Sequence, residues 1–211
     1  MPLVLKLIFA GFISYLVGAI PTAYLFGRVL KGIDIRQHGS GNVGATNAFR
    51  VLGKGPGSVV LLIDIIKGAI VPTAIANLFG LTYIFHLALL GCIAVVGHNW
   101  TIFLNFKGGK GIATSLGVLI GLTIKIGILR PVVLITMLVW LSTFLMSGYV
   151  SLASIMAATL LPILMVIFEQ PFEFVILGII FCAFVVLRHQ SNIKRLLAGK
   201  ENRVCFPFLK R

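Results

Sequence analysis

The chain has 211 residues, of which 59% are hydrophobic and only 11% are charged, and its mean hydropathy is +1.09. A water-soluble domain carries about 25% charged residues, so this composition excludes a soluble enzyme, a disordered chain, a disulfide scaffold and a coiled coil. The net charge is +13, from 18 Lys and Arg against 5 Asp and Glu. A basic membrane protein faces anionic lipids or anionic substrates. Nucleic acid is not expected as a partner, because little of the chain can lie outside the bilayer.

Bilayer-spanning helices need about 20 apolar residues each, and the sequence contains seven such windows, of which the third and seventh are short. They are Leu3–Phe26, Ser58–Phe79, Tyr83–Val96, Ile112–Ile128, Pro131–Tyr149, Val150–Phe168 and Phe172–Leu187. The first window is interrupted by Pro21 and is too long for a cleaved signal peptide. We therefore expect an all-α integral membrane protein with about seven transmembrane helices, forming one polytopic domain over residues 1–211.

The distribution of Lys and Arg predicts the orientation of the chain in the membrane. If the N-terminus is outside, the inner segments 27–57, 97–111 and 148–150 and the C-terminal tail hold 14 of the 18 Lys and Arg residues. The C-terminus is then cytoplasmic, as seven spans require. All the polar, glycine-rich segments, with short interfacial helices, fall on this same face. That one-sidedness favours a site at the cytoplasmic face over a pathway through the membrane.

The first polar segment runs from His38 to Arg50 and contains three glycines, which allow a ligand close to the backbone. We expect Ser40 and Asn42 to cap a short helix that ends at Gly53. Arg50 carries a fork-shaped donor that fits phosphate bidentately. The segment therefore indicates an anion site. The alternative is a capped helix whose arginine faces lipid head groups.

The second polar segment holds Lys107 and Lys110 among three glycines, directly before an apolar window. Free backbone N–H groups, a helix N-terminus and two ammonium groups together form a phosphate cradle. The segment is not a Walker A loop, because Gly111 follows Lys110 where that loop has Ser or Thr. The alternative is a cytoplasmic loop with snorkelling lysines, which would leave the glycines unexplained.

The third polar segment follows the last window, and the spacing of Ile193, Leu196 and Leu197 predicts an interfacial amphipathic helix. His189 and Asn192 lie three residues apart and hence on one helical face. A polar pair at this position could reach a site beneath the helices.

Polar residues also occur within the windows. Asp64 and Lys67 are three residues apart, and charges inside a membrane are costly and usually paired. Mutual pairing and a role in catalysis are both open. Ser151 lies near the cytoplasmic end of its window, whereas Ser154 fits helix packing. With so few carboxylates and no His–Cys cluster, the sequence predicts no metal site and no cofactor.

The segments together resemble the bacterial acyl-phosphate:glycerol-3-phosphate acyltransferase family. The matching stretches are GSGNVGATNAFR at 39–50, LIDIIKG at 62–68, GHNWTIFLNFKGGKGIAT at 97–114, YVSLAS at 149–154 and RHQSNIKRLLAGKEN at 188–202. The basic tail at 203–211 lies outside the resemblance. The resemblance implies a seven-span enzyme of the bacterial inner membrane with a cytoplasmic active site. It would acylate the 1-hydroxyl of glycerol 3-phosphate, giving lysophosphatidic acid in the first acylation of phospholipid synthesis.

The implied partners are glycerol 3-phosphate, acyl phosphate, membrane lipid and a soluble enzyme that produces acyl phosphate. The expected catalytic residues are His189, Lys110 and Ser40. The expected substrate-binding residues are Ser40, Gly41, Asn42, Asn47, Arg50, His98, Lys107, Gly108, Gly109, Lys110, Gly111, Ser151, His189 and Asn192.

Three alternatives stay open at this point. The proton of the attacking hydroxyl could pass to His189, to His98, to Asp64 or to the phosphate of the substrate itself. Either glycine-rich loop could hold either phosphate. A transporter of organophosphate anions is the competing class, although transporters place their sites near the membrane midplane.

Overall fold

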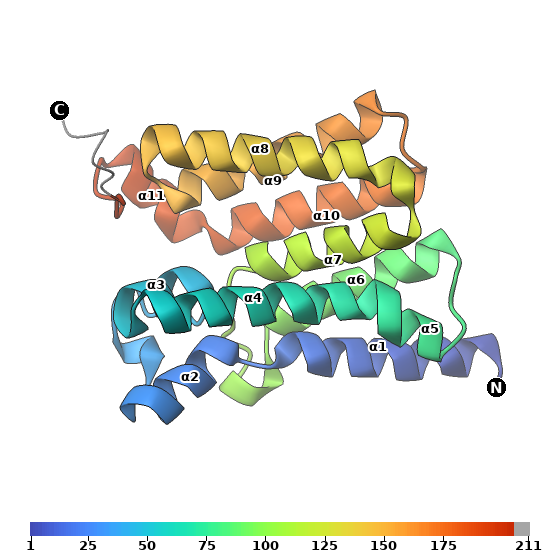
Figure 1. Ribbon diagram of the computed structural model, residues 1–211, viewed down its shortest axis with the longest axis horizontal. Coiled ribbons are helices and arrows are strands. Elements are labelled where there is room, and N and C mark those ends of the chain that lie inside the picture. Colours follow the sequence, from blue (N-terminus) through green and yellow to red (C-terminus); the bar gives the residue numbers. More distant parts are fainter. Residues whose placement is uncertain (205–211) are drawn as a thin grey trace. The chain divides into compact units, whose positions relative to one another are not determined.

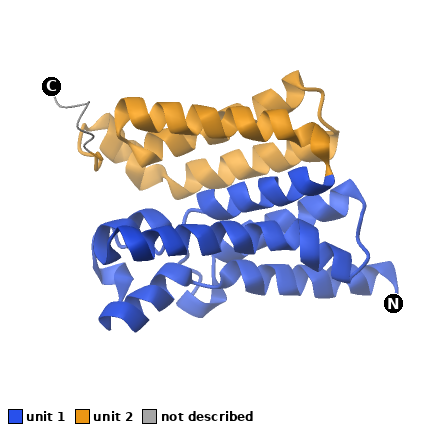
Figure 2. Cartoon of the chain, in the orientation of Figure 1, with its two compact units in different colours: residues 1–125 blue, residues 126–211 orange. Residues whose placement is uncertain are grey.

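A computed structural model describes residues 1–204, and within that range the chain forms helices and connecting turns without a strand (Figure 1). The predicted all-α class is confirmed. The chain divides into two compact units, Met1–Lys125 and Ile126–Arg211 (Figure 2). Part of the predicted basic tail, including Lys210 and Arg211, lies outside the described residues.

Unit 1 contains seven helices joined by short turns. The helices are α1 (Leu3–Ala19), α2 (Thr22–Lys31), α3 (Ala45–Leu52), α4 (Lys54–Ile70), α5 (Ala76–Leu78), α6 (Ile84–Asn99) and α7 (Ile112–Lys125), with 3-10 turns at Ile35–Gln37 and Ile102–Leu104 and a π turn at Val71–Ile75. The main packing pairs are α1 with α6, α4 with α7, and α3 with α4. Figure 1 shows α4 running alongside α7.

The described part of unit 2 contains four helices after a 3-10 turn. The turn is Gly127–Leu129, and the helices are α8 (Arg130–Ser147), α9 (Val150–Ile167), α10 (Phe172–Arg188) and α11 (Gln190–Leu197). Helix α9 packs against both α8 and α10. The indole N–H of Trp140 donates to the hydroxyl of Ser154 at 3.2 Å, so Ser154 serves helix packing as its position in the window suggested.

Each predicted window overlaps one or two helices, and within residues 1–204 five helical runs are long and apolar enough to cross a membrane. They are Leu3–Lys31, Lys54–Leu78, Ile84–Leu104, Gly127–Ser147 and Val150–Ile167. The pair α10 and α11, bent by 62°, makes a sixth if counted as one span. Helix α7 has 14 residues and is therefore about 21 Å long, shorter than the hydrocarbon core of about 30 Å. Length and composition thus give five or six spans, and the seventh depends on α7.

Glycines allow the helices of unit 1 to pack with their backbones in contact. A Cβ on Gly68 would collide with the carbonyl oxygen of Thr114, and one on Gly117 would collide with that of Ile65. The α1–α6 pair repeats this arrangement, because a Cβ on Gly18 would collide with the carbonyl of Ala94. Small residues at such crossings are the usual means of close helix packing in membranes, where dispersion contacts replace the hydrophobic effect.

The first helical run breaks at Ile20–Pro21, between α1 and α2. Proline has no backbone N–H, so the break releases carbonyl groups from the helical ladder. The carbonyl of Ile20 accepts a hydrogen bond from Nζ of Lys67 at 2.8 Å, and the carbonyl of Ala19 accepts one from Oγ1 of Thr101 at 2.6 Å. Side chains from two other parts of unit 1 thus satisfy a non-helical backbone that lipid could not solvate.

Candidate active site

The segment between His38 and Gly53 folds as a loop followed by helix α3. The helix begins at Ala45 after Gly44 and has no side-chain cap, so the prediction that Ser40 and Asn42 cap it is wrong. Oδ1 of Asn42 instead accepts a hydrogen bond from N–H of Gly44 at 3.0 Å, within a turn that precedes the helix. The predicted end at Gly53 is confirmed, with φ of 97°.

Asn47 fixes this loop from within α3. Its side chain is 1% exposed, and its Nδ2 donates to the carbonyl of His38 at 3.0 Å and to that of Ile35 at 3.3 Å. Its Oδ1 accepts from N–H of Ser40 at 2.8 Å. All its polar atoms are therefore used in holding the loop. Asn47 presents Ser40, which is exposed, rather than facing a ligand itself.

The loop rests on a small apolar core that joins α2, α3 and α4. Its buried members are Ala23, Ile35, Val43, Ala48, Leu52, Val60 and Leu104. Arg50 lies on the opposite, exposed side of α3, in its last turn. Within residues 1–204 no hydrogen bond or ion pair holds the guanidinium of Arg50, so it is available to bind an anion.

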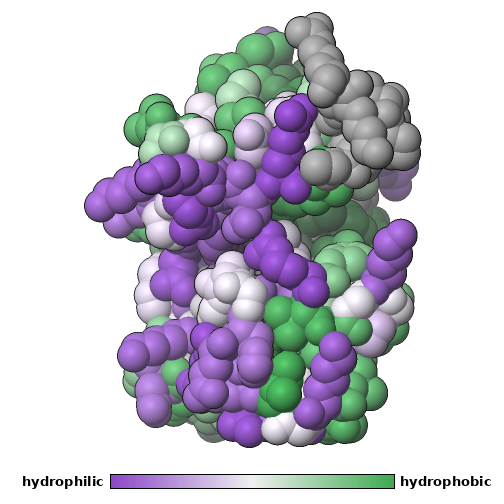
Figure 3. All heavy atoms as spheres, turned by 90° about the vertical axis from the view of Figure 1, so that its left-hand side faces the viewer, coloured by the Kyte–Doolittle hydropathy of each residue, from purple (hydrophilic) through white to green (hydrophobic). Residues whose placement is uncertain are grey.

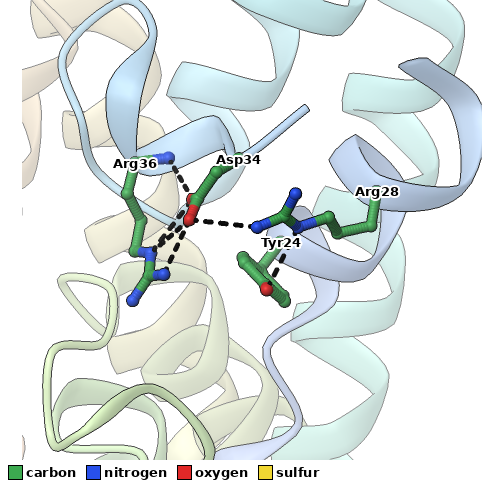
Figure 4. Close-up of polar contacts among 4 residues, drawn as sticks. All are labelled: Tyr24, Arg28, Asp34 and Arg36. Atoms are coloured by element: carbon green, nitrogen blue, oxygen red, sulfur yellow. Dashed lines mark hydrogen bonds and ion pairs between the residues drawn. The ribbon is translucent and has the colours of Figure 1, made fainter. Parts of the chain in front are cut away.

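A second charged cluster lies between α2 and the 3-10 turn that follows it (Figure 4). The carboxylate of Asp34 accepts two side-chain donors from Arg36, at 3.0 Å from Nε and 2.6 Å from Nη2, and pairs with Arg28 at 3.4 Å. Both guanidinium carbons lie 5.2 Å from the ring centroid of Tyr24. The hydrogen bonds from Arg36, opposed by burial, lower the pKa of Asp34 to about 2. The sequence analysis missed this cluster, although Asp34 is the one acid in a strongly basic loop.

Replacing Asp34 by Asn should destabilise the protein in a pH-dependent way. Because the folded pKa is below the ordinary value of 3.8, the carboxylate stabilises the fold above that pH, and the stabilisation fades as the pH falls towards 2. We expect the unfolding midpoint of Asp34→Asn to lie below that of the wild type at neutral pH and to converge with it in acid. Thermal unfolding in detergent across this range measures the difference. A gap that does not change with pH would contradict the assignment.

The end of unit 1 that carries α2 and α3 is rich in hydrophilic side chains (Figure 3). On this unit the second glycine-rich segment follows α6. N–H of Gly108 donates to the carbonyl of Asn99 at 3.1 Å, and N–H of Gly109 donates to that of His98 at 3.0 Å. Both glycines are buried, whereas Lys107 is exposed. The glycines therefore pack the loop onto the end of α6, which differs from the ligand-facing role that the sequence suggested.

Asp64 and Lys67, the charged pair of the Ser58–Phe79 window, form one buried group with neighbouring polar side chains. Oδ1 of Asp64 lies 2.8 Å from Nζ of Lys67, so the pairing suggested by their spacing is present. The same oxygen accepts from Oγ1 of Thr22 at 3.0 Å and lies 3.9 Å from Nδ1 of His98. Asp64, Lys67 and His98 are 1%, 4% and 7% exposed. The sequence placed His98 with the loop and among the candidate bases but not beside Asp64, and it gave Thr22 no role.

Unit 2 carries a separate polar network centred on Glu201. Its Oε1 accepts from Oγ of Ser151 at 2.9 Å and from Nδ2 of Asn192 at 2.5 Å, and its Oε2 accepts from Nε of Arg195 at 2.7 Å. Burial alone raises the pKa of Glu201, but hydrogen bonds from Asn192, Arg195 and Ser151 outweigh it and keep that pKa below its usual range. The carboxylate of Glu201 thus joins two predicted site residues, Ser151 and Asn192. The sequence offered no role for Glu201 itself.

His189 lies at the bend between α10 and α11 and is buried. Its Nδ1 is 2.8 Å from the carbonyl oxygen of Val185. A carbonyl can only accept, so Nδ1 carries the proton and Nε2 carries the lone pair in the neutral ring. Within residues 1–204 no three His, Cys, Asp or Glu side chains are grouped to hold a metal ion.

Comparison with known proteins places these segments in one family. The glycerol-3-phosphate acyltransferase profile matches residues 8–199. The glycerol-3-phosphate acyltransferase 2 of Moorella thermoacetica is 44% identical over 193 residues, covering 91% of this chain and 94% of its own. The glycerol-3-phosphate acyltransferase of Desulforudis audaxviator is 46% identical over 195 residues, covering 92% and 93%.

The fold agrees with a solved structure. The glycerol 3-phosphate form of PlsY, an integral membrane glycerol 3-phosphate acyltransferase, matches with a TM-score of 0.85 at 39% identity, covering 94% of this chain and 96% of that one. Its lysophosphatidic acid form matches with a TM-score of 0.82 at 38% identity, covering 94% and 95%. By sequence along nearly its whole length and by the arrangement of its helices, this chain belongs to the glycerol-3-phosphate acyltransferase family.

Proposed function

We propose that the protein transfers a fatty acyl group from acyl phosphate to the 1-hydroxyl of glycerol 3-phosphate, releasing phosphate and lysophosphatidic acid. The PlsY structures with glycerol 3-phosphate and with lysophosphatidic acid support the acceptor and the product. The observation that carries the proposal is the preformed loop of unit 1, in which Asn47 pins Ser40 while Arg50 stays exposed and unpaired by residues 1–204. That arrangement fits a small phosphate ester.

The chemistry explains why so many cations and so few carboxylates are present. Two phosphate-bearing substrates repel each other, and Arg50, Lys107 and Lys110 offset this repulsion. The hydroxyl oxygen attacks the carbonyl carbon, the bond from that carbon to the phosphate oxygen breaks, and phosphate leaves with the electron pair. We assign the hydroxyl proton to Nε2 of His189, with the substrate's own phosphate as the competing acceptor. Ser151 and Asn192 would orient the glycerol hydroxyls.

We further propose seven spans with the N-terminus outside and the C-terminus in the cytoplasm of the bacterial inner membrane. The concentration of Lys and Arg in alternate loops supports this orientation. Both glycine-rich loops would then face the cytoplasm, where a soluble enzyme can supply acyl phosphate. The buried charges Asp64 and Lys67 are bonded to each other, so they give little support to the alternative of a transporter for organophosphate anions.

A comparison of two acyl donors tests the reaction. Purified protein in lipid is given labelled glycerol 3-phosphate with either palmitoyl phosphate or a palmitoyl thioester. We expect labelled lysophosphatidic acid with the acyl phosphate alone. Product from the thioester as well would keep the acyltransferase and overturn the donor. No product from either donor in folded protein would overturn the reaction, and counter-flow of glycerol phosphate in sealed vesicles would then test transport.

Replacing Arg50 by Ala should strongly reduce the catalytic efficiency with glycerol 3-phosphate. A hydrogen bond to a charged group contributes about 1.5–3 kcal/mol, so we expect kcat/KM for glycerol 3-phosphate to fall by about 10–100-fold. Arg50→Lys should recover only part of this loss, because an ammonium group cannot bind phosphate bidentately. Lys54→Ala, an exposed cation at the start of α4, is the matched control. Unchanged kinetics for Arg50→Ala would remove Arg50 from the site.

A further inference from the structure

We propose that Asp64 and His98 act as a positioning pair that seats the Gly108–Gly109 stretch of the lysine-bearing loop, an inference that rests on the acyl transfer proposed above. The two residues lie on α4 and α6, and the loop follows α6 directly. The intramembrane ion pair thereby gains a role in the reaction, because it sets the place from which Lys107 and Lys110 reach a phosphate.

Two side chains besides His98 bind the carboxylate of Asp64. Lys67 binds its Oδ1 at 2.8 Å and Thr22 donates to the same oxygen at 3.0 Å. Lys67 is itself anchored, because its Nζ also donates to the carbonyl of Ile20 at 2.8 Å. The side chain of Asp64 is 1% exposed. It thus presents a fixed negative charge to the imidazole.

His98 is held between this charge and the loop. Its Nδ1 lies 3.9 Å from Oδ1 of Asp64, which is too long for a hydrogen bond but close enough for a strong electrostatic preference. Nδ1 of the ring thus lies on the side of the carboxylate. The edge of the ring that carries Nε2 faces Gly109.

The backbone of Gly109 lies directly against this edge. A Cβ on Gly109 would collide with Nε2 of His98 and would lie 2.9 Å from Cε1 and 3.1 Å from Cδ2. N–H of Gly109 also donates to the carbonyl of His98 at 3.0 Å. A Cβ on Gly108 would collide with that same carbonyl oxygen. The loop is thus seated on one residue by its ring and by its backbone.

This geometry separates His98 from the proton-transfer candidates. A general base must reach the substrate hydroxyl, but Nε2 of His98 faces the backbone of Gly109 and its Nδ1 lies towards the carboxylate of Asp64. His98 is therefore a positioning residue. Glycine is required at position 109 because the His98 ring leaves no space for a Cβ. This requirement holds without a bound ligand.

A double-mutant cycle tests the contact between the ring and the loop. Gly109→Ala should raise the KM for one phosphate substrate by about tenfold, because its Cβ displaces the loop. In the His98→Ala background, where the ring is absent, the same change should alter that KM by less than about twofold. An equal penalty in both backgrounds would overturn the proposal, because the Cβ would then block the ligand. Gly55→Ala, whose Cβ meets nothing within 4 Å, is the control.

The role of Asp64 needs a variant that does not leave Lys67 as a lone buried charge. Asp64→Asn combined with Lys67→Met removes both charges at similar volume. Positioning predicts that this double variant raises the same KM as Gly109→Ala does. A purely structural pair would reduce the folded fraction, and so the apparent kcat, while leaving both KM values unchanged. Wild-type KM values in the double variant would overturn the assignment.

Hydrogen exchange gives a readout that does not depend on turnover. The amide hydrogens of Gly108 and Gly109 are bonded to α6, so they should exchange slowly in the wild type. Exchange in the 104–111 stretch should accelerate by about tenfold in His98→Ala and in the neutralised pair, and not in Gly55→Ala. Unchanged exchange would overturn the seat even if acyl transfer is confirmed. Accelerated exchange in a protein that makes no lysophosphatidic acid would keep the seat and overturn the reaction.

Discussion

Replacing Glu201 by Gln is expected to reduce kcat/KM for acyl transfer by about 100-fold or more. The carboxylate accepts hydrogen bonds from Ser151, Asn192 and Arg195, and an amide can accept at only one of its two ends. Arg195 then loses its ion-pair partner, and the amide N–H₂ faces a donor. Hydrogen bonds to charged groups contribute about 1.5–3 kcal/mol each, and a network loses more than one bond at a time. The kinetics of the purified variant measure the loss.

The matched control for Glu201→Gln is Glu169→Gln, the same chemical change at an exposed turn of the same unit. It should leave the kinetics unchanged. Both Ser151→Ala and Asn192→Ala should lie between the wild type and Glu201→Gln, because each removes one bond. Since the folded pKa of Glu201 is lowered, its stabilising effect is present above the ordinary Glu pKa and is lost as the pH falls below it. Wild-type kinetics for Glu201→Gln would show that the network is dispensable.

Replacing Gly117 by Val should prevent stable folding of unit 1. The α-carbons of Gly117 and Gly68 bring α7 and α4 into backbone contact, and a single Cβ on Gly117 already collides with the carbonyl of Ile65. Larger side chains in a packed interior cost about 1–3 kcal/mol, and occasionally more. Here the obstacle is backbone on both sides, so the helices must separate and lose the whole interface. We expect little folded protein after extraction, with a lowered thermal midpoint in what remains.

Gly55→Val is the control for this prediction. Gly55 lies in the first turn of α4, and a Cβ there meets no atom within 4 Å. Both variants introduce a β-branched residue, which lowers helix propensity, but only Gly117 lies at a helix crossing. A thermal midpoint for Gly117→Val equal to that of Gly55→Val would show that α4 and α7 do not need their close approach.

The sequence was sufficient for features that depend on neighbouring residues. Apolar windows located every long helix, because span length follows from bilayer thickness. Spacing by three residues offered the pairing of Asp64 with Lys67 as one of two interpretations, and the pair is present. Gly53 ended α3 as expected, since its positive φ suits glycine. The amphipathic spacing after Arg188 gave α11 as a separate helix.

Features that depend on distant residues could not be read in this way. The sequence suggests Asn47 as a ligand contact, but in the fold it fixes the loop that precedes its own helix. Ser40 and Asn42 do not cap that helix. His98 meets Asp64 from another helix. Glu201 stands alone in a basic segment, and only the fold shows that Ser151, 50 positions earlier, donates to it. A lone acidic residue in a basic segment, as at Glu201 and Asp34, is the sequence signal that points to such a hydrogen-bond network.

The break at Ile20–Pro21 also constrains how the protein is made. The groups that satisfy its two carbonyls come from Lys67, 47 positions after Ile20, and from Thr101, 82 positions after Ala19. At a synthesis rate of about 5–20 residues per second, Thr101 leaves the ribosome about 4–16 s after Ala19. During that interval the carbonyl of Ala19 lacks its side-chain donor, whereas the carbonyl of Ile20 already has a local donor in N–H of Thr22 at 3.0 Å. The bend between α1 and α2 therefore gains its full set of hydrogen bonds only after the end of α6 has been synthesised.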